Sequence, residues 1–314
     1  MSQCWVIGDT AVDLLSDGDQ FIRFPGGTGA NISVALSRLG IENSLVTKLG
    51  NDPLATFLMD TLVNEKVGTQ NVSFSADHRT SLIAVSLDDR GERSFTFMVR
   101  PSADSQLEIR DFPRFERGDW VCVSAFILAR QPSRAATLTA ITQARTAGSF
   151  VCIDANMRAE VWDDKSLLVP ETLEALKTAD VAKMSEEEML LLTNKVSFQQ
   201  GVDELKKWPA KIKIITRAEK GAVLVVEQSE YCVEGYSVPV LDMTGAGDAF
   251  FAAFISQLIP LQHWSHERLV AAVEFSNACG SLVVQQKGAM SALPELDMVN
   301  KFITGEGKHV EVTK

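Results

Sequence analysis

The chain has 314 residues, of which 46% are hydrophobic and 23% charged, so it has an ordinary globular composition and can bury a substantial core. Its net charge of −11 disfavours nucleic acid as a partner. No apolar run reaches the length of about 18 residues that a transmembrane helix needs, which argues against membrane insertion.

The first residues lead directly into an apolar run at 4–7 and lack the basic segment of a secretory signal. The cysteines are odd in number and scattered through apolar runs, which favours reduced thiols over a disulfide framework or a zinc site. We therefore expect a cytoplasmic protein. The cysteines are Cys4, Cys122, Cys152, Cys232 and Cys279.

Short apolar runs alternate with amphipathic stretches along the chain, a pattern typical of βαβ units and of a mostly parallel sheet covered on both faces. Polar residues follow several of these runs: Gly8 and Asp9, then Asp154, Lys183 and Thr216. In parallel sheets, ligands bind beyond the carboxyl ends of strands, so these residues outline one site. The expected strands are 4–7, 44–49, 120–124, 150–153, 181–184, 212–216 and 222–226, and the expected helices include 31–39, 54–67, 134–147 and 170–178.

Two extended runs, 79–87 and 93–99, interrupt this alternation, and residues 88–92 between them have the composition of a hairpin turn. With the apolar piece 21–24, they predict a small antiparallel sheet that projects as a lid. A hairpin that extends the main sheet is the alternative. We expect one domain over residues 1–314, with a lid formed by about 10–25 and 79–104.

The strongest motif runs from Asp242 to Asp248 and is followed by a segment, 249–255, that is apolar on nearly all sides. Such a helix is buried, and its first N–H groups have no partner within the helix. The small residues Gly245, Ala246 and Gly247 let a ligand approach these groups, and the helix dipole favours an anion there. Asp248 is then a candidate general base for phosphoryl transfer. The alternative is a turn whose aspartate only caps the helix.

A second glycine-rich segment covers Gly26, Gly27, Thr28, Gly29, Ala30 and Asn31. The glycines permit a tight loop before a helix, and the Asn31 amide can both donate to and accept from a polyol. The segment lacks the full spacing of a dinucleotide fingerprint and does not directly follow the first strand, so it argues against a dehydrogenase.

These two motifs, with Gly40 and Gly50, resemble the signatures of the ribokinase-like (PfkB) carbohydrate kinases. The resemblance implies an α/β fold with a mostly parallel doubly wound sheet, helices on both faces and a small β lid. It also implies transfer of the γ-phosphoryl group of Mg-ATP to a sugar hydroxymethyl group. Residues 8–15, 93–97, 100–104, 287–290 and 293–294 most resemble bacterial fructokinases, particularly those of sucrose use.

Carried over by position, the resemblance makes Asp248 the base and the N–H groups of Gly245, Ala246 and Gly247 an anion hole. Asp13 could instead be a solvated loop acid, Arg158 a surface ion-pair partner, and Asn277 a helix-packing residue. The implied sugar-binding residues are Asp9, Asp13, Gly26, Gly27, Asn31, Arg100, Asn156 and Arg158. The implied nucleotide-binding residues are Lys183, Ser185, Thr216, Ala218, Gly221, Asn277 and Gly280.

The sequence departs from the family pattern at several of these segments. Ala155, Ser185 and Ala218 stand where the family usually has proline, asparagine and glycine, and Met243 replaces threonine or serine. Ser185 and Glu188 also form the pattern of a helix capping box, which needs no further role.

For metals, the resemblance gives Glu188 the role of organising Mg²⁺ through water, and Mg²⁺ needs few protein ligands. Asp242, Thr244 and the carbonyl of Gly288 could form a site for a monovalent cation, K⁺.

The leading prediction is therefore a fructokinase whose small-molecule partners are a sugar and ATP. Ribose, 2-keto-3-deoxygluconate and aminoimidazole riboside remain alternative acceptors, and a catalytically silent sugar- or nucleotide-binding homologue is the alternative of another class. Lid strands with exposed edges often pair between subunits, so a homodimer formed through the lid is a further expectation.

Overall fold

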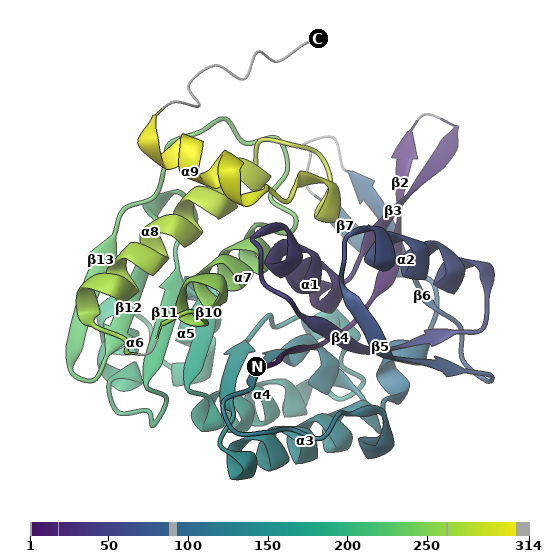
Figure 1. The fold of residues 1–314 in the computed structure, drawn as a ribbon, viewed down its shortest axis with the longest axis horizontal. Coiled ribbons are helices and arrows are strands. Elements are labelled where there is room, and N and C mark those ends of the chain that lie inside the picture. The colour runs from purple at the N-terminus through teal and green to yellow at the C-terminus, as the bar shows by residue number, and fades with distance from the viewer. Residues whose placement is uncertain (1, 18, 88–92, 262, 306–314) are drawn as a thin grey trace.

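The structure of this chain is a computed structural model that describes residues 2–17, 19–87, 93–261 and 263–305. Within these residues the strands form two sheets, shown in Figure 1. The larger has nine strands in the order β13-β12-β11-β10-β9-β8-β1-β4-β5, and the smaller has four in the order β3-β2-β6-β7. No helix of this described part is long and apolar enough to cross a membrane.

The main sheet is parallel from β5 to β11, and β12 and β13 are antiparallel additions at one edge. The prediction of a mostly parallel sheet is confirmed. Because β1, β8, β9 and β10 run the same way, their carboxyl ends meet at one edge. The strands are β1 (Cys4–Ile7), β4 (Ser44–Gly50), β5 (Gly68–Ser75), β8 (Trp120–Ser124), β9 (Phe150–Asp154), β10 (Val181–Ser185), β11 (Ile212–Thr216), β12 (Ala222–Val226) and β13 (Ser229–Val233).

Helices cover both faces of this sheet, because alternate residues of its strands point to opposite sides. On β1, Cys4 and Val6 join one apolar cluster, whereas Trp5 and Ile7 join the other. The first cluster includes α1 (Thr28–Arg38), α7 (Ala246–Leu258), α8 (His266–Val283) and α9 (Leu296–Thr304). The second includes α3 (Ser133–Ala147), α4 (Leu168–Thr178), α5 (Glu186–Thr193) and α6 (Phe198–Leu205), and α2 (Pro53–Asn64) contacts β4, β5 and the small sheet.

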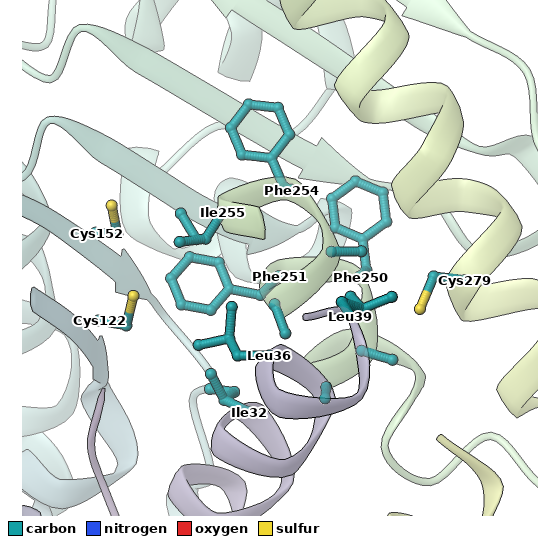
Figure 2. Packing of buried hydrophobic residues seen from close by; sticks show 14 of the residues in the cluster. Ile32, Leu36, Leu39, Cys122, Cys152, Phe250, Phe251, Phe254, Ile255 and Cys279 are labelled. Atoms are coloured by element: carbon teal, nitrogen blue, oxygen red, sulfur yellow. The ribbon is translucent and has the colours of Figure 1, made fainter. Parts of the chain in front are cut away.

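Helix α7 is buried on all sides, as its sequence predicts. Figure 2 shows Phe251 and Ile255 between helix α1 and the sheet, where Ile32 and Leu36 of α1 meet them. Ala249, Ala252 and Ala253 are fully buried as well, and their small size lets neighbouring elements approach the helix closely. The packing therefore fixes the start of α7 relative to α1.

The small sheet differs from the prediction in one respect. Its outer pairs are antiparallel, but the central pair of β2 and β6 is parallel, so the expectation of an antiparallel sheet is wrong there. Strands β2 and β6 both continue from the carboxyl edge of the main sheet, after β1 and β5, and therefore leave it in the same direction. The predicted turn at 88–92 lies outside the described residues. The strands are β2 (Ala11–Asp17), β3 (Gln20–Gly26), β6 (Ser81–Leu87) and β7 (Arg93–Phe97).

Candidate active site

The main chain at the start of helix α7 carries only small side chains at residues 245–247, so another group can approach it closely. Gly245 caps the helix with a φ of 81°, in the left-handed region, and no side chain bonds the cap. A Cβ atom at this position would lie 3.0 Å from the Cα of Ala289. A side chain at position 245 would therefore crowd Ala289, and the first N–H groups of the helix, which begins at Ala246, have no partner within the helix. Together with the helix dipole they favour an anion.

Asp248 lies in this first turn and contacts the other glycine-rich segment, residues 26–31, through Asn31. The Nδ2 atom of Asn31 donates to Oδ2 of Asp248 over 2.8 Å. Burial raises the pKa of Asp248, while the Asn31 bond and the charges of Lys183 and Arg158 partly oppose the rise. The structure thus brings the two strongest sequence motifs into direct contact.

Lys183 provides a cation at the same point. Its Nζ atom lies 2.9 Å from Oδ2 of Asp154, and both side chains are buried. A Cβ atom added to Gly247 would lie only 3.0 Å from this ammonium group. Burial alone would lower the pKa of Lys183, but the carboxylates of Asp154, Glu188 and Asp248 raise it. Lys183 is therefore charged and lies against the start of α7.

Gly8, which follows β1, and Gly29, in the first turn of α1, lie in direct main-chain contact. A Cβ atom on Gly8 would lie 2.7 Å from the Cα of Gly29, and a Cβ atom on Gly29 would meet Gly8 equally closely. Gly27 has a φ of 95°, and its own Cβ position would lie 2.6 Å from the Cα of Thr10. These positions exclude larger residues by contact between main chains.

The predicted sugar-binding acids lie beside this junction. Oδ1 of Asp9 accepts a bond from the N–H of Thr28 over 3.1 Å. A Cβ atom on Gly26 would lie 2.8 Å from Cγ of Asp13, because β2 and β3 pair side by side there. The Asp13 carboxyl group therefore packs directly over the glycine backbone, so it is not an isolated loop acid.

The remaining residues predicted to bind sugar lie after two strands: Asn156 and Arg158 follow β9, and Arg100 follows β7. The Nδ2 atom of Asn156 donates to Oγ1 of Thr28 over 2.8 Å, which ties the loop after β9 to α1. Arg158 is exposed, and its charge acts on Asp248. Arg100 is also exposed, with its guanidinium 4.6 Å from the ring centre of Phe97.

Ser185 and Glu188 form the predicted capping box at the start of α5. Oγ of Ser185 accepts from the N–H of Glu188 over 3.2 Å, and Oε2 of Glu188 accepts from the N–H of Ser185 over 2.7 Å. Oε1 of Glu188 accepts from the N–H of Met157 over 2.6 Å. The Glu188 carboxylate thus joins the ends of two neighbouring strands.

The predicted nucleotide loop follows β11. Oγ1 of Thr216 donates to the carbonyl of Met184 over 3.4 Å. Ala218 has a φ of 50° and Gly221 a φ of 86°, both in the left-handed region. Ala218 therefore holds a conformation for which glycine is better suited, which explains why glycine is usual there in the family pattern.

Asn277 and Gly280 lie on the inner side of α8. The Nδ2 atom of Asn277 donates to the carbonyls of Val233 and Glu234, over 3.3 and 3.0 Å. A Cβ atom on Gly280 would lie 3.5 Å from the carbonyl oxygen of Ala246, at the start of α7. Beside Asn277 is a cavity of about 410 Å³, which the sequence did not reveal, lined by residues 232–236, Val270 and Glu274.

The residues predicted to hold a monovalent cation are close together. Oδ1 of Asp242 accepts from the N–H of Thr244 over 3.0 Å, and its Oδ2 accepts from the N–H of Gly288 over 2.7 Å. Asp242 is buried. It therefore links the loop before α7 to the segment after α8.

Several buried acids lie around the site. The sugar- and nucleotide-binding residues predicted from the sequence did not include two of them, Asp104 and Asp154. Asp104, Asp154 and Asp9 are each nearly inaccessible. Burial, with the nearby charges of Asp104 and Asp248, raises the pKa of Asp9 to about 7. Burial also raises the pKa of Asp154 to about 6, against the opposing effect of Lys183. Asp154 directly follows a predicted strand, and this position is the signal in the sequence that marks it as a site residue. The burial of Asp104 depends on contacts distant in sequence, which the sequence does not reveal.

The arrangement of these residues agrees with the proteins to which the chain is similar in sequence and structure. Residues 1–296 match the family described as pfkB family carbohydrate kinase. A fructokinase of Vibrio alginolyticus is 39% identical over 305 residues, covering 96% of this chain and 99% of that protein. The structure of a Vibrio cholerae O395 fructokinase in its fructose, ADP and calcium ion bound form superposes with a TM-score of 0.92 at 40% identity, covering 96% and 99% of the two chains. An aminoimidazole riboside kinase from Salmonella enterica, complexed with aminoimidazole riboside and an ATP analogue, superposes with a TM-score of 0.89 at 30% identity, covering 96% and 100%.

Proposed function

The chain belongs to the pfkB family of carbohydrate kinases, and from that premise we propose that it is a fructokinase, which converts D-fructose and ATP to fructose 6-phosphate and ADP. The ribokinase-like fold expected from the sequence is confirmed by the superpositions. One observation above all supports the proposal: Asp248 meets Asn31 over 2.8 Å at the open start of a buried helix. A general base and a sugar-binding amide are thereby held together beside an anion site.

In this reaction Asp248 takes the proton from O6 of fructose while O6 attacks the γ-phosphorus of ATP. The bond between that phosphorus and the bridging oxygen breaks, ADP leaves, and Asp248 later releases the proton to solvent. The raised pKa of Asp248 makes its carboxylate a stronger base than an exposed one. Asn31 holds one oxygen of the base, which fixes the direction of the other.

The N–H groups of Gly245, Ala246 and Gly247 bind the transferring phosphoryl group, and Lys183 adds a fixed positive charge beside them. Because these donors are positioned before the reaction, little reorganisation is needed as charge develops. The sugar is held by Asp9, Asp13, Gly26, Gly27, Asn31, Arg100, Asn156 and Arg158.

The nucleotide occupies the side of the site formed by β10, β11 and α8. Thr216, Ala218 and Gly221 line its loop, Lys183 and Ser185 lie toward its phosphates, and Asn277 and Gly280 lie toward its base. Asn277 acts here by holding the main chain of residues 233–234 that borders the large cavity.

The acids near Lys183 fit a magnesium ion, which prefers oxygen ligands and keeps most of its waters. Oδ1 of Asp154 is buried and has no hydrogen-bond partner within the described residues, and the carboxylate of Glu188 lies nearby on the same sheet edge. Asp154 and Glu188 would hold the ion through water, and the ion would neutralise phosphate charge. Asp242, Thr244 and Gly288 are the candidate site for K⁺ behind the anion loop.

An aminoimidazole riboside kinase activity is the second candidate, because a kinase of that description shares 30% identity and the same fold over 96% of this chain. We further propose a cytoplasmic location, which the five free cysteines support. A homodimer formed through the small sheet is also proposed, since Phe21, Ile22 and Phe95 are exposed on it.

The test is an ATP-consumption assay of the purified protein with fructose, ribose, 2-keto-3-deoxygluconate and aminoimidazole riboside. We expect the highest kcat/KM with fructose, and a higher value with another sugar would contradict the substrate proposal. The variant Asp248→Asn should lower kcat by roughly 10²- to 10⁴-fold, the contribution of a general base, with little change in sugar affinity. Asp60→Asn, on the exposed side of α2, is the control and should keep normal turnover.

A further inference from the structure

Asp104 is a buried acid that the proposed reaction does not use. It belongs to a short 3-10 helix, Ala103–Gln106, which follows the last strand of the small sheet, and its exposed fraction is 4%. Within the described part of the chain its Oδ1 atom has no hydrogen-bond partner. A buried carboxylate oxygen without a donor is unfavourable, so such a group is expected to meet water, an ion or a ligand.

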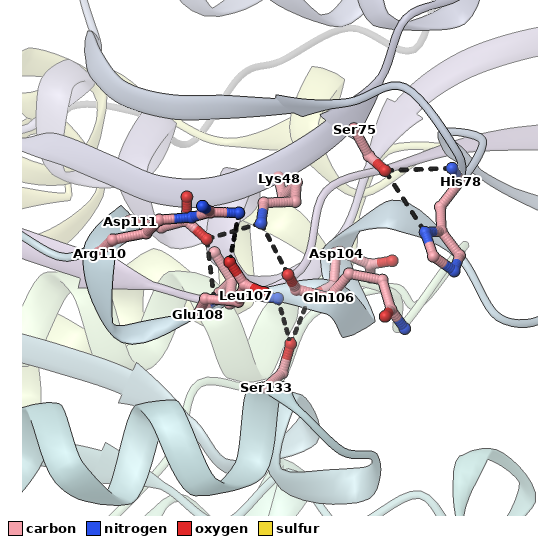
Figure 3. A network of polar contacts seen from close by, with 10 residues as sticks. All are labelled: Lys48, Ser75, His78, Asp104, Gln106, Leu107, Glu108, Arg110, Asp111 and Ser133. Carbon is pink, nitrogen blue, oxygen red and sulfur yellow. Dashed lines mark hydrogen bonds and ion pairs between the residues drawn. The ribbon is translucent and has the colours of Figure 1, made fainter.

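The segment that carries Asp104 is firmly anchored. Ser133 donates to the carbonyl of Asp104 over 2.9 Å. Lys48, at the end of β4, donates to the carbonyl of Gln106 over 2.7 Å and pairs with Asp111 over 2.7 Å. Figure 3 shows these contacts and shows the Asp104 side chain directed away from them. The segment is therefore held in a fixed place, and of the Asp104 carboxylate only Oδ1 lacks a donor within the described residues.

That side chain lines a cavity of about 40 Å³ between the small sheet and the main domain. The volume is enough for about three water molecules, so it can equally admit one or two hydroxyl groups. Two aromatic rings, Phe97 and Phe126, form part of its wall, and their centres lie 6.4 Å apart. Arg100 and Arg130 are the cations that line it.

Asp9 lies within range of the charges of both the cavity-lining Asp104 and the proposed base Asp248. The charges of both Asp104 and Asp248 act on Asp9 and help to raise its pKa. Three carboxyl groups therefore lie near one another: the proposed base, the acid that bonds Thr28, and the acid that lines the cavity. A sugar whose reacting hydroxyl lies at Asp248 would extend its opposite end toward Asp104.

We propose that Asp104 determines substrate specificity by accepting a hydrogen bond from the C1 or C2 hydroxyl of the ketose, the end remote from the phosphorylated O6. This inference rests on the proposed fructokinase function. The contact is distant from the transferring phosphoryl group, so it stabilises the bound substrate and the transition state equally. Its loss therefore raises KM and leaves kcat nearly unchanged.

The variant Asp104→Asn keeps the shape of the side chain and removes its charge. We expect its KM for fructose to rise roughly 10-fold, because the neutral amide oxygen of asparagine accepts a weaker hydrogen bond than a carboxylate does. The same measurement uses 1-deoxy-D-fructose and 2,5-anhydro-D-mannitol, which lack the C1 and the C2 hydroxyl. With the analogue that lacks the bound hydroxyl, wild type and variant should have nearly equal KM values.

Glu108→Gln is the matched control, since this exposed acid lies on the same segment, and it should behave as wild type. Ser102→Ala is a second variant, because the Ser102 hydroxyl bonds the Asp104 carboxyl group, and it should raise the KM for fructose by a smaller factor. It provides the test if Asp104→Asn does not fold.

An unchanged KM for fructose in both variants would overturn the role of Asp104. A KM that rises by the same factor for fructose and both analogues would also overturn it, because the effect would then be structural. Wild-type protein that does not phosphorylate fructose would instead contradict the proposed function, and this inference with it.

Discussion

Replacing Asp9 with asparagine should stabilise the sugar-free protein at alkaline pH. The Asp9 carboxyl group is 4% exposed and lies within the influence of two other acids, Asp104 and Asp248. Two hydrogen bonds, from the N–H of Thr28 and from the N–H of Asp9 itself, favour its charged form. Asparagine can still accept the bond from Thr28 through its carbonyl oxygen, and it removes the buried charge.

The size of the effect follows from the pKa of Asp9, which burial raises from 3.8 to about 7. The folded protein binds this proton more tightly than the unfolded chain does. Its contribution to stability is therefore complete below pH 3.8 and is lost as the pH rises through about 7. At a pH of about 8 the loss amounts to about 4 kcal/mol, and at a pH of about 5 to about 2 kcal/mol.

Thermal and urea unfolding at both pH values measure the difference between Asp9→Asn and wild type. We expect the variant to gain about 2 kcal/mol more, relative to wild type, at the higher pH than at the lower. Asp52→Asn is the control, because N–H groups of Thr80, Ala55 and Leu54 lower the pKa of Asp52 despite its burial. It should lose stability equally at both pH values, since Asp52 is ionised in both. A pH-independent difference for Asp9→Asn would refute the reasoning.

Two further substitutions test other parts of the site. Lys183→Met should lower kcat by roughly 10²-fold or more in a steady-state assay, because a fixed charge beside the phosphoryl group is lost. The KM for fructose should change little. Near-normal turnover would argue against the role of Lys183. Ala218→Gly should raise the unfolding free energy by up to about 1 kcal/mol in thermal unfolding, because glycine accepts the φ of 50° without strain, and a lowered Tm would contradict this explanation.

The parts of the fold that bury the most apolar surface were predictable. The seven predicted strands are all present, because each is a short apolar run that the core requires. Strands β5 and β13 were missed for the opposite reason. They lie at the two edges of the main sheet and bury little, β5 only Val72 and β13 only Val233, so their sequences carry little apolar pattern.

Asn31 and Asp248, which bond each other in the structure, were both predicted as site residues, because each follows a glycine motif and has its own chemical reason to face a ligand. The position of Asp104 was not predicted. Its segment is bonded through main-chain carbonyls to Lys48 and Ser133, which lie far from it in sequence and on other elements. The parallel pairing of β2 with β6 was missed likewise, since it joins segments with no local turn between them.

The contact of Gly8 with Gly29 has a consequence for how such an enzyme can vary. Since the two residues meet through main chain alone, no rotamer change can alter the separation between the end of β1 and the start of α1, the helix whose Asn31 bonds Asp248. Adaptability is then confined to the small sheet and the 3-10 segment beneath it. We therefore expect substitutions there to change which sugar is accepted while the contact between Asn31 and Asp248 stays constant.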